Sequence, residues 1–302
     1  MSAVGTRTGA VHVLRRSRRR TWTAERSAVA GALLATPLML FIAVLLIYPL
    51  VRLVSISTGP PDGLGNVSGF FEGSANLRVL RITLLDSAIV TVISVAVGAV
   101  IAWSMHTTRR TSTRLLLWAA MILPFLMGAV NKLYALGVIL QTQGIVNKLL
   151  IEVGIADQPI EMLYTQFAVV LGMVYQMLPF AVLPLYASFR TINPELVLAA
   201  ESLGAGRLRA LMNTVVPLAL PSVLASATIV FMISVGFVLT PVLLGGATAP
   251  FMASFINSAL FDFYNLARAS VTSLVLLICA LVVVVVALVF LGRERLSKAV
   301  AS

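Results

Sequence analysis

The sequence predicts an all-α integral membrane protein with six transmembrane helices, and its composition and its apolar segments carry that prediction. Apolar residues make up 59% of the chain and charged residues only 11%, whereas a typical soluble domain carries about 25% charged residues. The mean hydropathy is +1.00. A helix needs about 20 apolar residues to cross a bilayer. Segments of that order cover residues 28–54, 82–104, 115–140, 166–189, 217–243 and 269–291.

The first apolar segment follows a basic tail. Within residues 1–27 the tail carries Arg15, Arg16, Arg18, Arg19, Arg20 and Arg26. Such a start resembles a signal peptide, but the apolar run is much longer than the roughly 7–15 residues of a signal peptide's hydrophobic region. We therefore expect an uncleaved anchor. The predicted organisation is a basic cytoplasmic tail at 1–27, a transmembrane domain at 28–292 and a C-terminal cytoplasmic tail at 293–302.

The connections between the later segments differ in their content of Lys and Arg. The N-terminal tail and the connections at 105–114, 190–216 and 292–302 hold 16 of the 22 basic residues. Because Lys and Arg accumulate on the cytoplasmic side of membrane proteins, we expect both termini and the 190–216 loop in the cytoplasm. The net charge of +11 follows from this asymmetry. Membrane lipid headgroups account for the basic tail without nucleic acid as a partner.

Residue types that support enzyme chemistry are scarce. Cys279 is the one cysteine, so neither an intrachain disulfide nor a cysteine metal cluster can form. The two histidines, His12 and His106, lie far apart in the sequence. The chain lacks the G-x-x-x-x-G-K-[ST] phosphate loop, so it does not bind ATP by that route. We expect a protein that is not an enzyme and holds no metal or cofactor.

The most informative segment is the polar interruption from Asn193 to Pro221, which begins with a short helix whose two ends are marked. Asn193 is suited to the N-cap and Pro194 to the first helical position. Glu195 lies where the helix dipole favours a negative charge. Gly204 is placed to end the helix in a left-handed conformation. A small apolar face at helical spacing contains Leu196, Ala199, Ala200 and Leu203. Such a helix between two spans predicts a docking surface for another protein.

This segment resembles a family's cytoplasmic signature, which reads E-A-A-x-x-x-G and closes further on with an I-x-L-P-like run. Ala199 and Ala200 match the two alanines and Gly204 the glycine, and Val216 with Pro217 matches the closing pair. The chain thus resembles the membrane subunit of bacterial ATP-driven, binding-protein-dependent (ABC) importers of type I, and most of all the polyamine-type permeases. Further matching runs are N-K-L-Y-A from Asn131, G-I-V-N-K-L-L from Gly144 and T-P-V-L-L-G-G from Thr240.

The resemblance implies a permease subunit in the bacterial inner membrane. Two permeases, identical or paralogous, would form the translocation path, and an extracytoplasmic solute-binding protein would deliver the solute. A cytoplasmic ATPase dimer would bind the ATP, so this chain would need no cofactor. The 193–204 helix would couple the permease to that ATPase through Pro194, Leu198, Ala199, Ala200, Glu201, Leu203 and Gly204.

Two positions depart from the family's pattern. Leu198 replaces the acidic residue that opens the signature, although Glu195 and Glu201 lie nearby on the same helix. Phe237 stands where family members tend to carry an acid shortly before the T-P-x-L-L-G-G run. The loss of that acid weakens the argument for a polycationic solute.

Five residues are candidates for the translocation path. Asp86 and Lys132 lie in or near apolar segments, where charged side chains are costly and often functional. The alternative is that both reach toward the external interface. Tyr175 and Gln176 lie within a predicted span, and the alternative for them is an ordinary polar contact between helices. Phe237 is included because of its position before the T-P-V-L-L-G-G run.

Two other classes of protein remain open from the sequence. A secondary transporter normally carries ionisable residues buried in the middle of the membrane and often contains inverted repeats, and neither is clear here. A membrane scaffold or assembly protein needs only the spans and a docking helix. The solute and the identity of the second permease are not specified by the residues.

Overall fold

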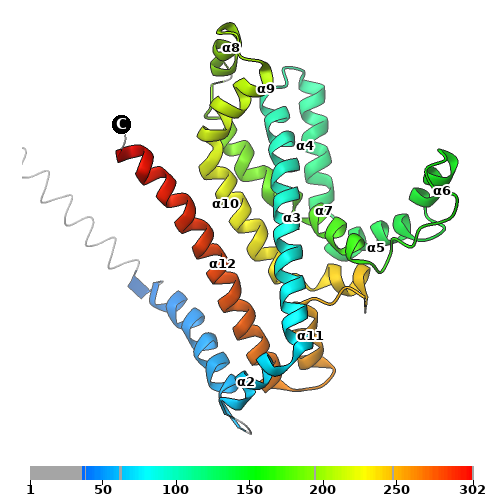
Figure 1. The fold of residues 1–302 in the computed structure, drawn as a ribbon, viewed down its shortest axis with the longest axis vertical. Coiled ribbons are helices and arrows are strands. Elements are labelled where there is room, and N and C mark those ends of the chain that lie inside the picture. The colour runs from blue at the N-terminus through cyan, green and yellow to red at the C-terminus, as the bar shows by residue number, and fades with distance from the viewer. Residues whose placement is uncertain (1–35, 38, 61–62, 194, 247, 301–302) are drawn as a thin grey trace, which may run out of the picture. The chain divides into compact units, whose positions relative to one another are not determined.

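Figure 1 shows a computed structural model of the chain, in which residues 36–37, 39–60, 63–193, 195–246 and 248–300 are described. These residues form helices joined by turns and contain no β-strand, so the all-α prediction is confirmed. The chain forms two compact units, and the second, Ile56–Ser302, contains every helix from α2 to α12.

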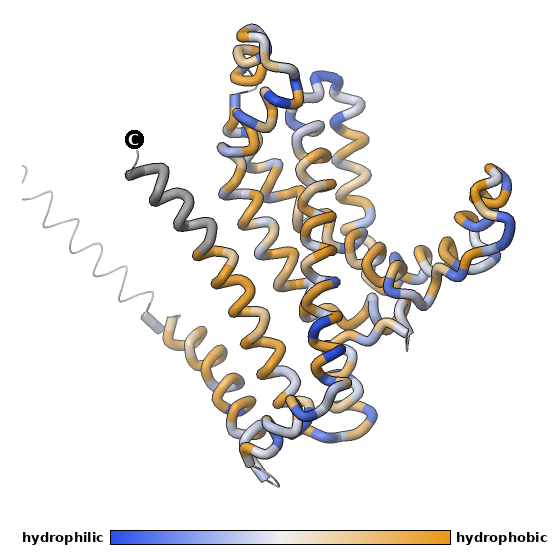
Figure 2. Tube along the Cα trace, viewed as in Figure 1, coloured by the Kyte–Doolittle hydropathy of each residue, from blue (hydrophilic) through white to orange (hydrophobic). Residues whose placement is uncertain are grey.

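Six helical stretches among the described residues are long and apolar enough to cross a membrane, which is the predicted number. Figure 2 shows their apolar character along the trace. The stretches are Met39–Ser57, Ser74–Thr107, Ala129–Glu152, Gln166–Phe189, Arg207–Val235 and Leu266–Val289. The predicted span 166–189 coincides with α7 (Gln166–Phe189). Two predicted spans are longer in the structure, as α3 (Ser74–Thr107) and α12 (Leu266–Val300). Residues 28–35 of the first predicted span, and the 1–27 tail, lie outside the described residues.

The predicted span 115–140 is wrong in its extent, because the structure divides it between α4 (Thr111–Leu126) and α5 (Ala129–Leu140). Met127 and Gly128 are extended between the two helices. Pro124 lacks the N–H that would continue the helical hydrogen bonds, and glycine has a low helix propensity. In Figure 1, α4 runs beside α3, whereas α5 and then α6 (Ile145–Glu152) lead away from it.

The predicted span 217–243 is also wrong at its C-terminal end. The helix α10 (Val216–Val235) stops at Gly236, and a π-helical turn, η2 (Pro241–Gly245), follows. Gly246 then adopts a φ of +56°, which glycine tolerates far better than other residues. At its start α10 continues from α9 (Arg207–Ala210) and the π-helical turn η1 (Leu211–Val215). Two further short helices are α2 (Gly65–Glu72) and α11 (Met252–Phe261).

One asparagine holds the connection between α5 and α7 together. Asn147 of α6 is buried, and its Nδ2 donates hydrogen bonds to the carbonyls of Gln141 (3.1 Å) and Ile160 (2.9 Å). The backbone N–H of Ile160 donates back to Asn147 Oδ1 at 2.8 Å. The asparagine of the G-I-V-N-K-L-L run therefore fixes both ends of the α6 loop.

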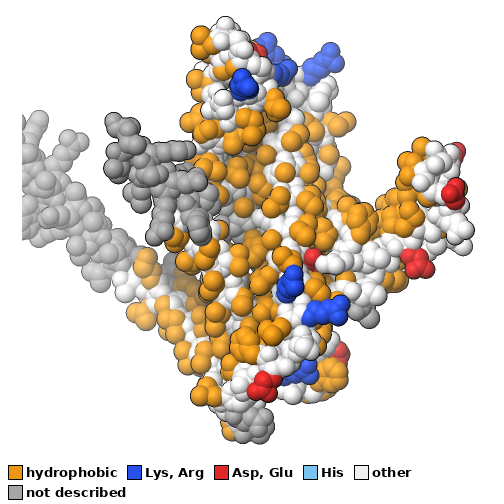
Figure 3. All heavy atoms as spheres, viewed as in Figure 1, with side chains coloured by type: hydrophobic (Ala, Val, Ile, Leu, Met, Phe, Trp, Pro, Cys, Tyr) orange, Lys and Arg blue, Asp and Glu red, His pale blue; other side chains and the backbone are white. Residues whose placement is uncertain are grey.

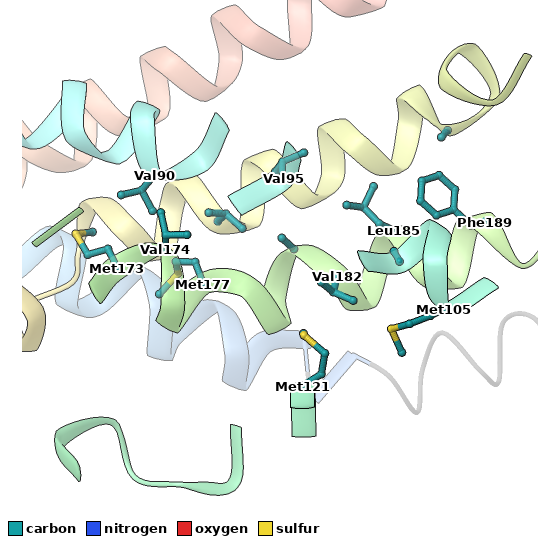
Figure 4. Packing of buried hydrophobic residues seen from close by; sticks show 14 of the residues in the cluster. Val90, Val95, Met105, Met121, Met173, Val174, Met177, Val182, Leu185 and Phe189 are labelled. Carbon is teal, nitrogen blue, oxygen red and sulfur yellow. The ribbon is translucent and has the colours of Figure 1, made fainter. Parts of the chain in front are cut away.

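The main hydrophobic core lies between α3, α7 and α10 (Figure 4). At its centre the helices approach closely, because a Cβ added to Gly98 of α3 would lie only 3.0 Å from the Cβ of Ala181 of α7. Ser226 Oγ of α10 donates to the Ala181 carbonyl at 3.3 Å. Small residues at such contacts allow membrane helices to pack backbone against backbone. Residues labelled in Figure 4 are Val90, Val95, Met105, Met121, Met173, Val174, Met177, Val182, Leu185 and Phe189.

Candidate functional site

The predicted docking helix is present as α8 (Glu195–Ser202), and its start is capped as predicted. Asn193 Oδ1 accepts a hydrogen bond from the backbone N–H of Glu195 at 3.0 Å, and Asn193 Nδ2 donates to Glu195 Oε2 at 3.2 Å. Pro194 lies outside the described residues. Local contacts thus define the start of α8, which explains why the sequence predicts it.

The end of α8 has the hydrogen-bond pattern of a glycine-terminated helix. Gly204 adopts a φ of +90°, as predicted. Its backbone N–H donates to the Glu201 carbonyl at 3.0 Å, and the N–H of Ala205 donates to the Ala200 carbonyl at 3.1 Å. These two bonds form a Schellman motif, which satisfies carbonyls that the helix leaves free.

The predicted apolar face of α8 points away from the protein. Leu196, Ala199 and Leu203 are exposed, with Leu203 89% exposed. Val197, which the sequence analysis did not single out, is the buried residue of the helix. Ala200 is half-buried and packs against the main core, so it differs from Ala199 in its surroundings. The outward face is therefore the part of α8 that is free to contact another protein.

The acid position of the family signature lies on the accessible part of this helix. Leu198 is 60% exposed, and Glu201 is half-buried. No ion pair to Glu201 is found among the residues that the structure describes. In Figure 3, basic side chains gather at the end of the molecule formed by α8, α9 and the start of α4. The exposed arginines of these segments are Arg109, Arg110, Arg114, Arg207 and Arg209.

Three candidate path residues lie together between α5 and α7. Lys132 of α5 is buried, and its Nζ lies 5.9 Å from the centre of the Tyr175 ring. Such a placement is a cation–π contact. Gln176 is also buried, and its Nε2 donates to the Ala129 carbonyl at 3.3 Å. These contacts attach the start of α5 to the middle of α7, and Lys132 packs between the two helices.

The other two candidates lie elsewhere, so the five residues do not form one site. Asp86 of α3 is buried, and its Oδ1 accepts a hydrogen bond from Gln166 Nε2 at 2.7 Å. Its Oδ2 has no hydrogen-bond partner within the described part of the chain. Phe237 is half-buried just past α10, where it packs against the main core. Gln166, which the sequence analysis missed, is the residue that connects Asp86 to α7.

Two cavities that the sequence does not predict meet at Thr248, at the opposite end of α3 from α8. One, of about 760 Å³, lies between α3, η2 and α11, and its charged lining residues are Arg78 and Arg268. The other, of about 780 Å³, is lined mainly by polar residues and contains Glu161. The Thr248 hydroxyl donates to the Tyr164 carbonyl and so joins the loop that follows η2 to the loop that precedes α7. None of the five candidate path residues lines either cavity.

The chain matches a model of one protein family, described as the binding-protein-dependent transport system inner membrane component, over residues 94–298. The match covers more than half of the chain and includes α7, α8 and α10. The protein therefore belongs to this family. Together with the six apolar stretches, this makes it a multi-pass inner-membrane protein.

Curated relatives carry transport names. The spermidine/putrescine transport system permease protein PotB of Haemophilus influenzae is 33% identical over 181 residues, which are 60% of this chain and 63% of that protein. PotB of Escherichia coli is 33% identical over 170 residues, 56% of this chain and 62% of that protein. The matched regions thus span less than two thirds of these relatives. The sulfate transport system permease protein CysT of Salmonella typhimurium is 27% identical over 203 residues, 66% of this chain and 69% of CysT.

A solved structure shares the fold. It is the crystal structure of a bacterial ABC transporter involved in the import of the acidic polysaccharide alginate. One of its chains superposes with a TM-score of 0.70 and 19% identity, over 91% of this chain and 99% of that chain. The predicted architecture of an importer permease is therefore confirmed at the level of the fold.

Proposed function

We propose that this chain is the permease subunit of an ATP-driven solute importer and that α8 is its contact with a separate ATPase. The observation that carries the proposal is the outward apolar face of α8, formed by Leu196, Ala199 and Leu203. This face lies on a helix with both ends fixed, in the segment that matches the family signature. The relatives' names as transport permeases support an importer over a secondary transporter or a scaffold.

The proposed partners follow from this role. A cytoplasmic ATPase dimer binds the ATP, a second permease, identical or paralogous, completes the path, and an extracytoplasmic binding protein delivers the solute. This chain contributes no ATPase site and no cofactor. The ATPase drives transport only because it binds the inward-open and outward-open states with different affinity, since equal affinity would shift neither population.

The test is reconstitution of the importer in proteoliposomes, with the ATPase, binding protein and second permease from neighbouring genes. We expect ATP hydrolysis to increase several-fold when the binding protein carries its solute. Spermidine, putrescine and sulfate are the first solutes to assay, because the names of the relatives contain them. Solute uptake driven by an ion gradient without ATP would contradict the proposal, as would failure to form a complex with the ATPase.

We propose, from the distribution of Lys and Arg, that both chain ends and α8 face the cytoplasm. Ile155 is 70% exposed in the structure. In a Cys279→Ser background, an impermeant thiol reagent added to sealed cells should therefore label the Ile155→Cys variant. The same reagent should leave Gly206→Cys unlabelled until the membrane is opened, although Gly206 is exposed and has open space around it. Labelling of Gly206→Cys in sealed cells would show that the 190–216 loop lies outside the cell and would contradict the proposed orientation.

A further inference from the structure

We propose that Trp103 and His106, at the C-terminal end of α3, are positioning residues that attach the junction between α7 and α8 (residues 189–193) to α3. The attachment delivers movement of α8 to the membrane-spanning helices. This inference rests on the proposed function, because it assigns to these residues a step between the ATPase contact and the transport path.

The first link joins a side chain of α3 to the backbone of the junction. His106 Nε2 lies 3.2 Å from the carbonyl oxygen of Ile192, a residue 86 positions further along the chain. A carbonyl oxygen only accepts hydrogen bonds, so Nε2 carries the proton and donates it. Ile192 is buried and immediately precedes Asn193, the cap of α8. The hydrogen bond therefore holds the chain at the point where α8 begins.

The second link joins the same end of α3 to the last residue of α7. The ring of Trp103 lies 5.5 Å from the ring of Phe189, at an interplanar angle of 88°. The ring of Trp103 also lies 5.6 Å from the ring of His106, at an interplanar angle of 54°. The edge-to-face pair of Trp103 and Phe189 is favourable beyond the burial of its area. Because Phe189 is buried, this contact fixes the end of α7 while His106 fixes the start of α8.

The third link joins α8 to the same cluster. Val197, the buried residue of α8, belongs to the hydrophobic core that contains Phe189 and Ile192. Ala210 of α9 and Val215 of η1 are buried in that core as well. The outward face of α8 is free, whereas its inward side packs against α9 and η1 and joins the hydrophobic core that also contains Met105 at the end of α3. A displacement of α8 by the ATPase is thus transmitted through packed side chains to α3 and α7.

The test compares three variants in the assembled importer, in nanodiscs and in a Cys279→Ser background. The reporter is Ser258→Cys, which lines the cavity at the other end of α3. Its rate of labelling by a thiol reagent is measured without nucleotide and with ATP plus vanadate. Local opening of residues 193–205 is measured by amide hydrogen exchange, and docking is measured by the amount of ATPase that co-purifies.

His106→Ala should leave ATPase docking unchanged but accelerate exchange in residues 193–205 about two- to tenfold, the factor expected for one hydrogen bond. It should reduce the ATP-induced change in labelling of Ser258→Cys by a similar factor. His106→Gln should restore both values, because the amide nitrogen can donate to Ile192. The matched control is Thr107→Val, since the Thr107 hydroxyl donates to the Trp103 carbonyl of its own helix, at 3.0 Å.

A normal ATP response in His106→Ala would overturn the inference, and so would failure of His106→Gln to restore it. Faster exchange throughout the permease would show a general loss of stability and would also overturn the positioning role. Failure of the proposed function gives a different result, because the importer with an intact His106 would then neither bind the ATPase nor change its labelling with ATP.

Discussion

An aspartate in place of Leu203 is expected to weaken binding of the permease to its ATPase by about 30-fold while leaving the permease folded. Leu203 is 89% exposed directly after α8, so the substitution removes no internal contact of any size. In the complex the carboxylate would be buried against apolar groups without a partner, which is costly. A loss of about 2 kcal/mol, typical of a central interface residue, weakens binding about 30-fold.

The measurement is a titration of purified ATPase against the permease in nanodiscs. Leu64→Asp is the matched control, because Leu64 is 76% exposed and precedes α2, far from α8 in the sequence. This control should bind the ATPase like the unmodified permease. Unchanged binding by Leu203→Asp, at normal permease yield, would show that Leu203 of the α8 segment does not contact the ATPase and would contradict the proposal.

A leucine at Gly98 is expected to prevent the packing of α3 against α7 and so to abolish the folded permease. Even a Cβ at this position would lie 3.0 Å from the Cβ of Ala181 and 3.5 Å from its backbone carbonyl carbon. Neither atom can rotate away, so the helices must separate, which costs about 3 kcal/mol or more. The yield of monodisperse protein and its melting temperature in detergent measure the effect.

A paired exchange separates steric overlap from other causes. Gly98→Ala should lower the melting temperature, and Ala181→Gly in the same chain should recover most of the loss, because it removes the opposing methyl group. Gly69→Leu in α2 is the control, since within the described part of the chain nothing beyond its own helix turn and neighbouring residues lies within 4 Å of a Cβ added there. An equally low melting temperature in the double variant would contradict the explanation.

The ends of α8 could be predicted from the sequence because they depend on local chemistry. Asn193 caps through the backbone of Glu195, and Gly204 closes the helix through residues three to five positions away. The orientation of the helix could not be predicted in the same way. Val197 and Ala200 face inward because α9, η1 and the main hydrophobic core lie there, and those contacts depend on the tertiary fold.

The membrane-spanning helices likewise have features that the sequence predicts and features that depend on the tertiary fold. Hydropathy located α7 fully but did not detect the interruptions at Gly128 and Gly236, because apolar residues continue across both. The grouping of Lys132 with Tyr175 and the bond from His106 to Ile192 join residues distant in sequence. No spacing rule predicts such pairs. The structure explains the first glycine of the run T-P-V-L-L-G-G, because Gly245 packs directly on Val169 of α7 and leaves no space for a side chain.

Docking of α8 on the ATPase is measured most directly by site-specific photo-crosslinking from α8 in the assembled importer. A photoreactive amino acid at Leu203 should form a covalent product with the ATPase, and its yield should change when ATP is added. The same amino acid at Leu218, an exposed residue of α10 within an apolar stretch, should give no such product. We expect the crosslink from Leu203 and none from Leu218. Crosslinking of the ATPase from Leu218 but not from Leu203 would contradict it.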